Sequence, residues 1–470
     1  MLVTVGALVT GRAGEGDFSM TVASSLSAAN RVAPDGVTGR IELGDLIDLR
    51  PVSPAQIFVV ALCAAALFID GYDIQVMALA VPSLAAGWAL SPSSFGLALS
   101  AVMIGLVVGS GLLGPLGDRL GRRTMLVAAM LFIGISTCCT SLATSPEQFA
   151  IWRFITGVAL GAGIPSCAAL TSEYAPVAHR SFVLGLINIA TPLGAFSAGF
   201  IAPPVLAAYG WRGAFLIGGI APLLLAVVAL RLPESLKFLL ARRPGDARIA
   251  AVLRRVAPDV DASSVHLEPA ASGGRGSLFG PVSPAFIGRT LLLWGMLVLN
   301  FFNLYMLTSW LPTLLQQAGW GADAALRGAV LIQGGGVFGG LLMARFMDRG
   351  HTRAALVGGF VLSAVSLALF PVLPGYAAWV ALLLLTGAGI SGSQLSLNAL
   401  SAAYYPPVFK ATGVAWALVI GGLGSIAAPI AGGVLIDMKL APVSILALLA
   451  IPSLICAAGV GLMRREWQAH

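Results

Sequence analysis

Two acidic residues, Asp70 and Asp73, stand in the middle of the apolar stretch LFIDGYDIQVMALAVPSL, which begins at Leu67. Residues three positions apart share one side of a helix, and Gly71 between them leaves room for a ligand or another backbone. Two carboxylates in a low dielectric oppose each other's ionisation and titrate as a coupled unit. Because ionisable groups within membrane segments usually mark ion pathways, the pair is predicted to carry protons. A purely structural ion pair with a neighbouring helix is the alternative.

Arg153 is the predicted partner of this pair. It lies near the start of another apolar stretch, at a depth about one helical turn from that of Asp73 if the two helices run antiparallel. A guanidinium can bind a carboxylate through two parallel hydrogen bonds. We therefore predict that protonation of the acids frees Arg153 to bind a substrate carboxylate. An ion pair that persists throughout is the alternative.

A second set of polar side chains lies in the later part of the chain, within NFFNLYMLTSW and about 90 residues beyond it. Amides in apolar segments are costly when they face lipid, so these are expected to face a cavity, where neighbouring aromatic rings can stack on an aromatic solute. Helix packing is the alternative for the aromatic residues. The predicted substrate-binding residues are Asn300, Asn303, Tyr305, Gln394, Asn398 and Trp416.

These residues must be positioned by membrane helices. Of the 470 residues, 58% are hydrophobic and 10% are charged, and the mean hydropathy is +0.92. A soluble domain cannot bury that much apolar surface, so the sequence predicts an all-α integral membrane protein. Windows of about 20 residues, the length that crosses a bilayer, indicate twelve transmembrane helices: 57–84, 95–116, 124–143, 149–173, 182–207, 213–232, 286–314, 325–346, 353–373, 377–404, 413–436 and 442–463.

The net charge of +7 follows the predicted membrane topology. If both termini are cytoplasmic, the segments on that side hold 23 of the 27 Lys and Arg residues, as the positive-inside rule requires. The basic residues therefore indicate orientation in a lipid bilayer and not a nucleic-acid site. The four His and five Cys have no metal-ligand or disulfide spacing, so we expect no metal, no cofactor and no enzymatic centre.

The chain repeats itself at an offset of 230 residues. GDRLGRR at 117–123 is matched by MDRGHTR at 347–353, and the two acids correspond to Asn300 and Asn303. Parallel repeats of six spans predict two pseudo-symmetric six-helix bundles with a substrate site between them. The predicted division is a disordered cytoplasmic tail (1–50), an N-terminal six-helix bundle (51–232), a cytoplasmic linker (233–285) and a C-terminal six-helix bundle (286–470).

Charged residues gather at the predicted cytoplasmic face of both halves. Opposite charges can hold such a face shut, and their separation would let the bundles rock apart. Side chains that only set the topology are the alternative for the outer members. The predicted gating residues are Asp118, Arg119, Arg122, Arg123, Glu173, Arg180, Asp348 and Arg349.

Two segments resemble the loop and fourth-span signatures of the major facilitator superfamily: GPLGDRLGRR and RFITGVALGAG. Four more resemble the aromatic acid:proton symporter family: DGYD, SEYAPVAHR, PESLKFLL and YYPPVFKATGVAW. The resemblance runs from about residue 41 to the C-terminus. Members of this family often carry an arginine in span 11 where this chain has Gly422.

The resemblance implies the major facilitator fold and proton-coupled uptake of a benzoate-like carboxylate, such as a hydroxybenzoate, across a bacterial inner membrane by alternating access. The proton gradient would supply the energy, and a monomer would suffice. Transport of another organic acid or a sugar, or drug efflux, is the alternative on the same fold. Span 5 has Ala198 and Gly199 where antiporters typically have Gly-Pro, which favours symport. A membrane solute sensor that does not transport is an alternative of another class.

Overall fold

The computed structural model describes residues 40–42, 52–176, 179–242, 246–256, 266–268, 280–406 and 409–463. The first half contains α4 (Pro54–Trp88), η1 (Pro92–Phe95), α5 (Gly96–Leu112), α6 (Gly114–Leu120), α7 (Arg122–Ser141), α8 (Pro146–Tyr174) and α9 (Arg180–Ala229). The second half contains η3 (Gly280–Val282), α12 (Ile287–Gln317), α13 (Ala322–Ala329), α14 (Leu331–Asp348), α15 (Thr352–Leu369), α16 (Tyr376–Tyr404), α17 (Lys410–Asp437), α18 (Pro442–Leu448) and α19 (Ala450–Leu462). Between them lie α10 (Leu236–Arg242) and α11 (Ala247–Val256).

The described part contains eleven helices that are long and apolar enough to cross a membrane. One of them, α9, has 50 residues and is interrupted by the non-helical Gly210, with φ 64° and ψ −171°. Arg212, just after this break, donates to Ala143 O at one end of the bundle, whereas Leu230 O accepts from Arg123 at the other end. Because α9 supplies two passes, the prediction of twelve transmembrane helices in an all-α membrane fold is confirmed.

Short polar segments start the two helices that carry the charged residues of the membrane interior. At the start of α4, Ser53 N donates to Gln56 Oε1 at 2.7 Å, and Gln56 N donates to Ser53 Oγ at 3.3 Å. At the start of α8, Gln148 N donates to Ser145 Oγ at 3.3 Å. Both helices also have proline at the first position, where a missing N–H costs nothing. These caps determine where each helix begins and therefore how deep its charged residues lie.

The two halves repeat their helix packing. In the first half α4 packs on α9 and α5 on α8, and in the second half α12 packs on α17 and α14 on α16. A Cβ added at Gly105 would lie 2.2 Å from Phe154 O, and one at Gly335 would lie 2.1 Å from Leu384 O. Only glycine lets two backbones approach this closely. Each residue in the second contact is 230 positions after its counterpart, so the sequence repeat is also a repeat in three dimensions.

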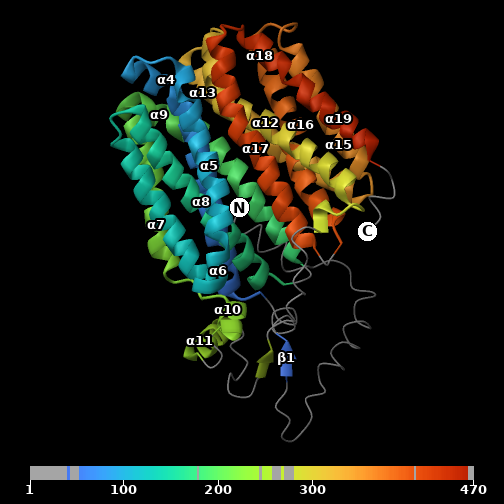
Figure 1. The fold of residues 1–470 in the computed structure, drawn as a ribbon. Coiled ribbons are helices and arrows are strands. Elements are labelled where there is room, and N and C mark those ends of the chain that lie inside the picture. The colour runs from blue at the N-terminus through green and yellow to red at the C-terminus, as the bar shows by residue number, and fades with distance from the viewer. Residues whose placement is uncertain are drawn as a thin grey trace, which may run out of the picture.

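The two bundles stand side by side in Figure 1 and meet through α5 against α17, α9 against α14 and α4 against α12. Ser100 donates to Ile426 O at 2.8 Å across this boundary, and a Cβ at Gly96 would lie 3.0 Å from Pro429 O. These contacts lie toward the end of the molecule that carries η1, which we call the η1 end. The opposite end, with α10 and α11 below the first bundle in Figure 1, is the linker end.

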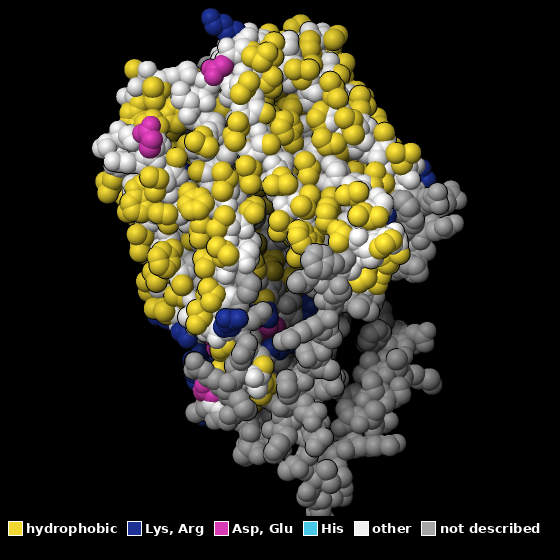
Figure 2. All heavy atoms as spheres, in the orientation of Figure 1, with side chains coloured by type: hydrophobic (Ala, Val, Ile, Leu, Met, Phe, Trp, Pro, Cys, Tyr) yellow, Lys and Arg dark blue, Asp and Glu magenta, His cyan; other side chains and the backbone are white. Residues whose placement is uncertain are grey.

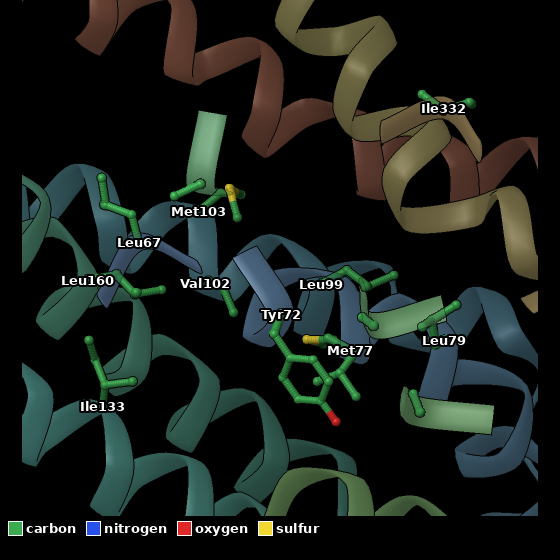
Figure 3. Packing of buried hydrophobic residues seen from close by; sticks show 14 of the residues in the cluster. Leu67, Tyr72, Met77, Leu79, Leu99, Val102, Met103, Ile133, Leu160 and Ile332 are labelled. Atoms are coloured by element: carbon green, nitrogen blue, oxygen red, sulfur yellow. The ribbon is translucent and has the colours of Figure 1, made fainter. Parts of the chain in front are cut away.

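Helix α4 is held in place by a continuous core of apolar side chains from the first bundle. Leu67, Tyr72 and Met77 of α4 belong to the same buried cluster as Val102 of α5 and Leu160 of α8 (Figure 3). Because interiors are close-packed, such a core leaves α4 little freedom to rotate about its axis. The acids on α4 are therefore held on a defined side.

The flanks of the molecule are apolar. Figure 2 shows hydrophobic side chains over the visible flank and Lys and Arg side chains toward the two ends. Large side chains such as Leu224 and Phe338 are 64% and 74% exposed. Exposed apolar area of this extent is a liability in water but is covered by lipid in a bilayer.

A short parallel strand pair lies outside the helical bundles. β1 (Arg40–Glu42) pairs with β2 (His266–Glu268), with Arg40 opposite His266. The prediction of a disordered tail over 1–50 is therefore wrong for these three residues, because their backbone groups pair with a strand from the linker. The rest of that range lies outside the described residues.

Candidate functional site

Asp73 and Arg153 form a buried ion pair between α4 and α8. Arg153 donates from Nη1 to Asp73 Oδ1 at 3.0 Å and from Nη2 to Asp73 Oδ2 at 2.5 Å, and both side chains are fully buried. Thr137 of α7 donates to Asp73 Oδ1 at 3.2 Å, and the guanidinium lies 5.5 Å from the centroid of the Phe215 ring. The partner predicted from helix depth is thus in contact, and its geometry is bidentate.

Asp70 is held differently. It lies one turn nearer the linker end and is only 2% exposed. Its Oδ1 has no hydrogen-bond partner among the described residues. The guanidinium of Arg153 is already bound to Asp73, so the two acids are not equivalent: Asp73 is paired with a cation, whereas no ion pair of Asp70 is found in the described part of the chain.

A cavity of about 140 Å³ lies between the bundles, near the middle of the helices. From the first bundle it is lined by α4 and α9, and from the second by α12, α14 and α16. Its lining is Gly71, Ile74, Thr191, Pro192, Ala195, Leu304, Tyr305, Thr308, Gln333, Gly336, Ser391, Gln394 and Leu395. The walls combine apolar surface with neutral amides and hydroxyls, which is the composition of small-molecule sites.

The acid pair lies beside this cavity and not in its wall. Gly71 and Ile74 each follow one of the acids in sequence, and they line the cavity. Because successive residues of a helix point about 100° apart, Asp70 and Asp73 point into the first bundle instead. The prediction that Gly71 allows a close neighbour agrees with the packing, since a Cβ there would lie 1.9 Å from Thr191 O.

Three predicted substrate-binding amides form one hydrogen-bonded chain. Asn300 donates from Nδ2 to Gln394 Oε1 at 2.8 Å, and Gln394 donates from Nε2 to Asn398 Oδ1 at 3.0 Å. Asn300 also donates to Ile390 O at 3.2 Å. Gln394 reaches the cavity, as does the predicted Tyr305, while the other two amides orient Gln394 from behind.

Two other predicted substrate-binding residues lie away from the cavity. Asn303 donates from Nδ2 to Leu449 O at 3.0 Å and to Ser453 Oγ at 2.9 Å, which places it against the last helices of the second bundle. Trp416 is 38% exposed and lies against Trp294, with ring centroids 6.0 Å apart. The lining of the cavity includes neither residue, because the side of a helix that a residue faces depends on packing and not on residue type.

Several polar residues near the centre were not predicted. Thr191, Thr308, Gln333 and Ser391 line the cavity, and Gln333 donates to Thr308 Oγ1 at 3.3 Å. Gln75 is fully buried, and neither amide atom has a partner among the described residues. The repeat contained a signal for Gln75, because it stands 230 positions before the cavity residue Tyr305.

The charges at the linker end are paired within the first half. Arg122 Nη1 lies 3.1 Å from Glu173 Oε1, and the Ser235 hydroxyl also donates to Glu173. Arg123 N donates to Glu234 Oε1 at 2.9 Å. Arg119 is exposed and Arg180 is partly buried. Glu234 thereby ties the start of α7 to the segment after α9.

The second half has fewer such contacts. Asp348 and Arg349 are exposed at the end of α14, and Arg353 donates to Gly461 O of α19. The backbone of Asp118 lies in α6, but its side chain is outside the described part. Within the described ranges, the ion pairs of the linker end lie inside the first half and none joins the two bundles.

Two six-helix bundles around a central cavity, with ionisable groups buried beside it, define a membrane transporter. The chain belongs to the Major Facilitator Superfamily, whose family model matches residues 63–429. The fold is also that of the xylose transporter XylE from E. coli in a partially occluded inward open conformation. The TM-score is 0.65 at 18% identity, over 86% of this chain and 97% of that one.

Curated relatives show which members of the superfamily this chain is similar to. The chain is 33% identical over 437 residues to the 4-hydroxybenzoate transporter PcaK of Pseudomonas aeruginosa, covering 90% of this chain and 95% of the relative. It is also 33% identical over 442 residues to a gallate transporter of Pseudomonas putida, with the same coverage. A benzoate transport protein of Acinetobacter baylyi is 28% identical over 91% of this chain and 94% of its own. The resemblance to the aromatic acid family is thereby confirmed.

Proposed function

We propose that this chain imports an aromatic carboxylate of the hydroxybenzoate class together with protons, by alternating access. The names of relatives at 33% identity, for 4-hydroxybenzoate and gallate, support the substrate class. The observation that carries the proposal is the cavity of about 140 Å³ between the bundles, adjacent to the helix that holds the buried acids. The proton gradient drives the cycle, so the transporter needs no cofactor, and one chain holds the whole site.

The size and lining of the cavity support a small aromatic acid. It is smaller than the roughly 300–1,000 Å³ of pockets for drug-sized ligands, which favours a single ring. Tyr305 offers a ring face or edge, and Gln394 and Gln333 offer amide N–H groups to a carboxylate. The described lining contains no Lys or Arg, so neutral donors hold the substrate carboxylate in this conformation.

Protons act through the two acids in sequence. Arg153 compensates the charge of Asp73, whereas Asp70 Oδ1 is buried without a hydrogen-bond partner among the described residues, so a charge there is costly. Asp70 therefore exchanges a proton first. When a second proton reaches Asp73, the guanidinium of Arg153 is released and becomes available to the substrate carboxylate.

Helix α4 connects proton binding to the substrate. Its Gly71 side contacts α9 and lines the cavity, while the side about 100° around the helix carries the acids. Close packing makes such an element bistable and not continuously deformable. A change of charge at the acids thus shifts α4 against α9 and alters the wall of the cavity.

Alternating access requires the linker end to close when the η1 end opens. The bundles contact each other toward the η1 end in the structure. We infer that closure of the linker end brings partners from both halves together. The residues assigned to this step are Asp118, Arg119, Arg122, Arg123, Glu173, Arg180, Asp348 and Arg349.

Uptake by purified protein in liposomes tests the function directly. Labelled 4-hydroxybenzoate is expected to accumulate under an inward proton gradient, and unlabelled benzoate or gallate should compete while xylose does not. Competition by xylose alone would favour a sugar transporter, extrusion would favour efflux, and binding without accumulation would favour a sensor. Each of these results would contradict the proposal.

Voltage at equal pH separates the proton stoichiometries. One monoanion with one proton moves no net charge, whereas a second proton makes uptake electrogenic and adds about 2.3 kcal/mol per 100 mV. The two acids support the second case. An uptake rate that does not respond to voltage would exclude it.

A matched pair of variants tests the cavity. Gln394→Leu removes an amide that lines it, and Gln317→Leu removes an exposed amide at the end of α12. Because a hydrogen bond to a charged group contributes about 1.5–3 kcal/mol, the first variant is expected to raise KM by about tenfold or more. The second should leave KM unchanged, and equal effects would remove the cavity from the proposal.

The proposed location is the inner membrane of a bacterium, with both termini cytoplasmic. The excess of Lys and Arg at the linker end supports this orientation. A reporter enzyme that is active only outside the cytoplasm, fused to the C-terminus, should remain inactive. An active fusion would reverse the orientation.

A further inference from the structure

A second cavity, of about 700 Å³, lies at the linker end of the first bundle. It is lined by the start of α4, the start of α7, residues 230–234 and helix α11. Figure 1 shows α11 below the first bundle. It shares no lining residue with the central cavity. Four arginines line it, Arg123, Arg231, Arg248 and Arg255, against the single carboxylate of Glu234.

The single carboxylate in the lining is already engaged. Glu234 Oε1 accepts hydrogen bonds from two backbone N–H groups, Arg123 N at 2.9 Å and Ser235 N at 3.0 Å. Arg248 is paired with Asp246, with Nη2 2.7 Å from Oδ2. The remaining three arginines leave the cavity with an excess of positive charge.

Two of these arginines are oriented by main-chain carbonyls. Arg123 donates from Nη2 to Leu230 O, and Arg255 donates from Nη1 to Arg231 O at 3.4 Å. A guanidinium has five N–H donors in a planar fork, and each of these bonds uses one nitrogen of its fork. Arg123 Nε is buried and has no partner among the described residues. Two such forks from different helices match the oxygens of a phosphate.

The cavity also has an apolar wall, formed by Phe58 of α4, Leu232 and Val252 of α11. It lies level with the first turns of α4 and α7, where these membrane helices begin. A phosphate beside an apolar chain at the edge of a bilayer is the chemistry of a phospholipid head group. Basic pockets at this level are typical binding sites for anionic lipids.

We propose that this cavity binds a phosphate group, supplied by an anionic phospholipid or by a soluble phosphate. The bound phosphate connects the start of α7, which carries Arg123, to α11 of the linker. The site is separate from the transport cavity, so lipid composition can affect the stability of the linker end without contact with the substrate.

Adjacent arginines on α11 provide a matched test. Both arginines are exposed, but Arg255 lines the cavity, while Arg254 is absent from the described lining and donates to Ala250 O of its own helix. We place the full-length protein in phosphatidylcholine nanodiscs that contain increasing fractions of phosphatidylglycerol. Thermal unfolding measures stability, and native mass spectrometry measures how much of each lipid the protein retains. R255Q is expected to weaken phosphatidylglycerol binding about fivefold, which equals about 1 kcal/mol per basic side chain at a membrane surface. R254Q should bind as the unmodified protein does.

The remaining arms distinguish the ligand sources and overturn the proposal if it is wrong. Inorganic phosphate is also added to the protein in pure phosphatidylcholine, and the unfolding temperature is compared with that in phosphatidylglycerol. If lipid supplies the phosphate, inorganic phosphate should raise the unfolding temperature less than phosphatidylglycerol does. If soluble phosphate is the ligand, inorganic phosphate should give the full Arg255-dependent increase. Equal retention of phosphatidylglycerol and phosphatidylcholine, with no phosphate effect, would refute the site. Equal losses of phosphatidylglycerol binding in R254Q and R255Q would contradict a specific site and indicate attraction by diffuse surface charge. Circular dichroism of R255Q confirms that its helices are intact.

Discussion

The first helix of each half carries two polar residues at equivalent repeat positions, and the two pairs are held in opposite ways. In the first bundle, Asp73 is bound by Arg153 and Asp70 Oδ1 has no partner among the described residues. In the second, Asn300 donates to Gln394 and Asn303 donates to Leu449 O and Ser453. The amides satisfy their donors without charge, whereas one oxygen of the acid pair lacks a partner in the part of the chain that the structure describes.

This difference suggests that the two repeated six-helix bundles have different roles. A neutral amide keeps the same charge and hydrogen-bonding groups at every physiological pH. The second bundle can therefore hold one geometry and orient Gln394 at the cavity. A buried carboxylate changes its interactions when it gains or loses a proton. In the proposed function, the first bundle would respond to protons while the second would provide a constant binding surface. Exchanging side chains between the two pairs tests this interpretation.

The largest effect is expected from Asp73→Asn. It leaves the guanidinium of Arg153 buried without a counter-charge, which costs about 3–5 kcal/mol of stability, and gradient-driven uptake is lost. Unfolding of purified protein in detergent and uptake by liposomes measure the two effects. The double variant Asp73→Asn with Arg153→Leu removes both charges and should regain most of the stability but not transport. A single variant as stable as the unmodified protein would contradict the buried ion pair.

Asp70→Asn is expected to separate transport from stability. The amide has nearly the same shape, and Asp70 Oδ1 has no hydrogen bond to lose among the described residues, so the unfolding temperature should not fall. Accumulation against a gradient should be abolished, because the first proton site is missing. Exchange of labelled for unlabelled substrate across the liposome membrane should continue. Accumulation at the unmodified rate would place proton coupling elsewhere.

The reverse exchange, Asn300→Asp, introduces an acid into the neutral pair. An ionised aspartate there faces Gln394 Oε1 and Ile390 O, two acceptors that the present amide serves as a donor. The loss is expected to be about 1–3 kcal/mol at high pH and to diminish at low pH, where the protonated group can donate again. The folded state then binds the proton more tightly than the unfolded state, so stability falls as pH rises. Unfolding measured across pH tests this, and a flat profile would contradict it.

The smallest effect is expected from Asn303→Ala. The residue packs against the last helices of its own bundle and is not part of the cavity lining. Loss of its hydrogen bonds should cost about 1 kcal/mol, while KM for 4-hydroxybenzoate should stay within about twofold. A large rise in KM with unchanged stability would return Asn303 to the substrate site, as the sequence pattern alone had indicated.

Part of the site was predictable because helix geometry converts sequence position into depth. A rise of 1.5 Å per residue places Arg153 of α8 about one helical turn from the depth of Asp73 of α4, within reach of a long side chain, and the two are in contact in the structure. The 230-residue repeat likewise identified equivalent helices in the two halves. Tyr305 and Gln394, which were predicted to bind substrate, both line the central cavity. In each case local spacing determined the outcome.

The direction in which a membrane helix turns its side chains was not predictable in the same way. A helix that lipid or protein can cover on every side has no clear amphipathic stripe to orient it. Asn303 and Trp416 were therefore assigned to the wrong side of their helices with respect to the cavity, and Gln75 and Gln333 were overlooked.

The sequence by itself determined that this chain is a twelve-helix membrane protein written as two repeats, because length, hydropathy and period depend only on local composition. It also determined which helix carries buried charge. Only the tertiary structure decided that the acids lie within the first bundle and the neutral amides beside the cavity, and that the linker-end charges pair within one half. Those outcomes depend on how close-packed helices rotate against one another, which is decided jointly by contacts between residues far apart in the chain.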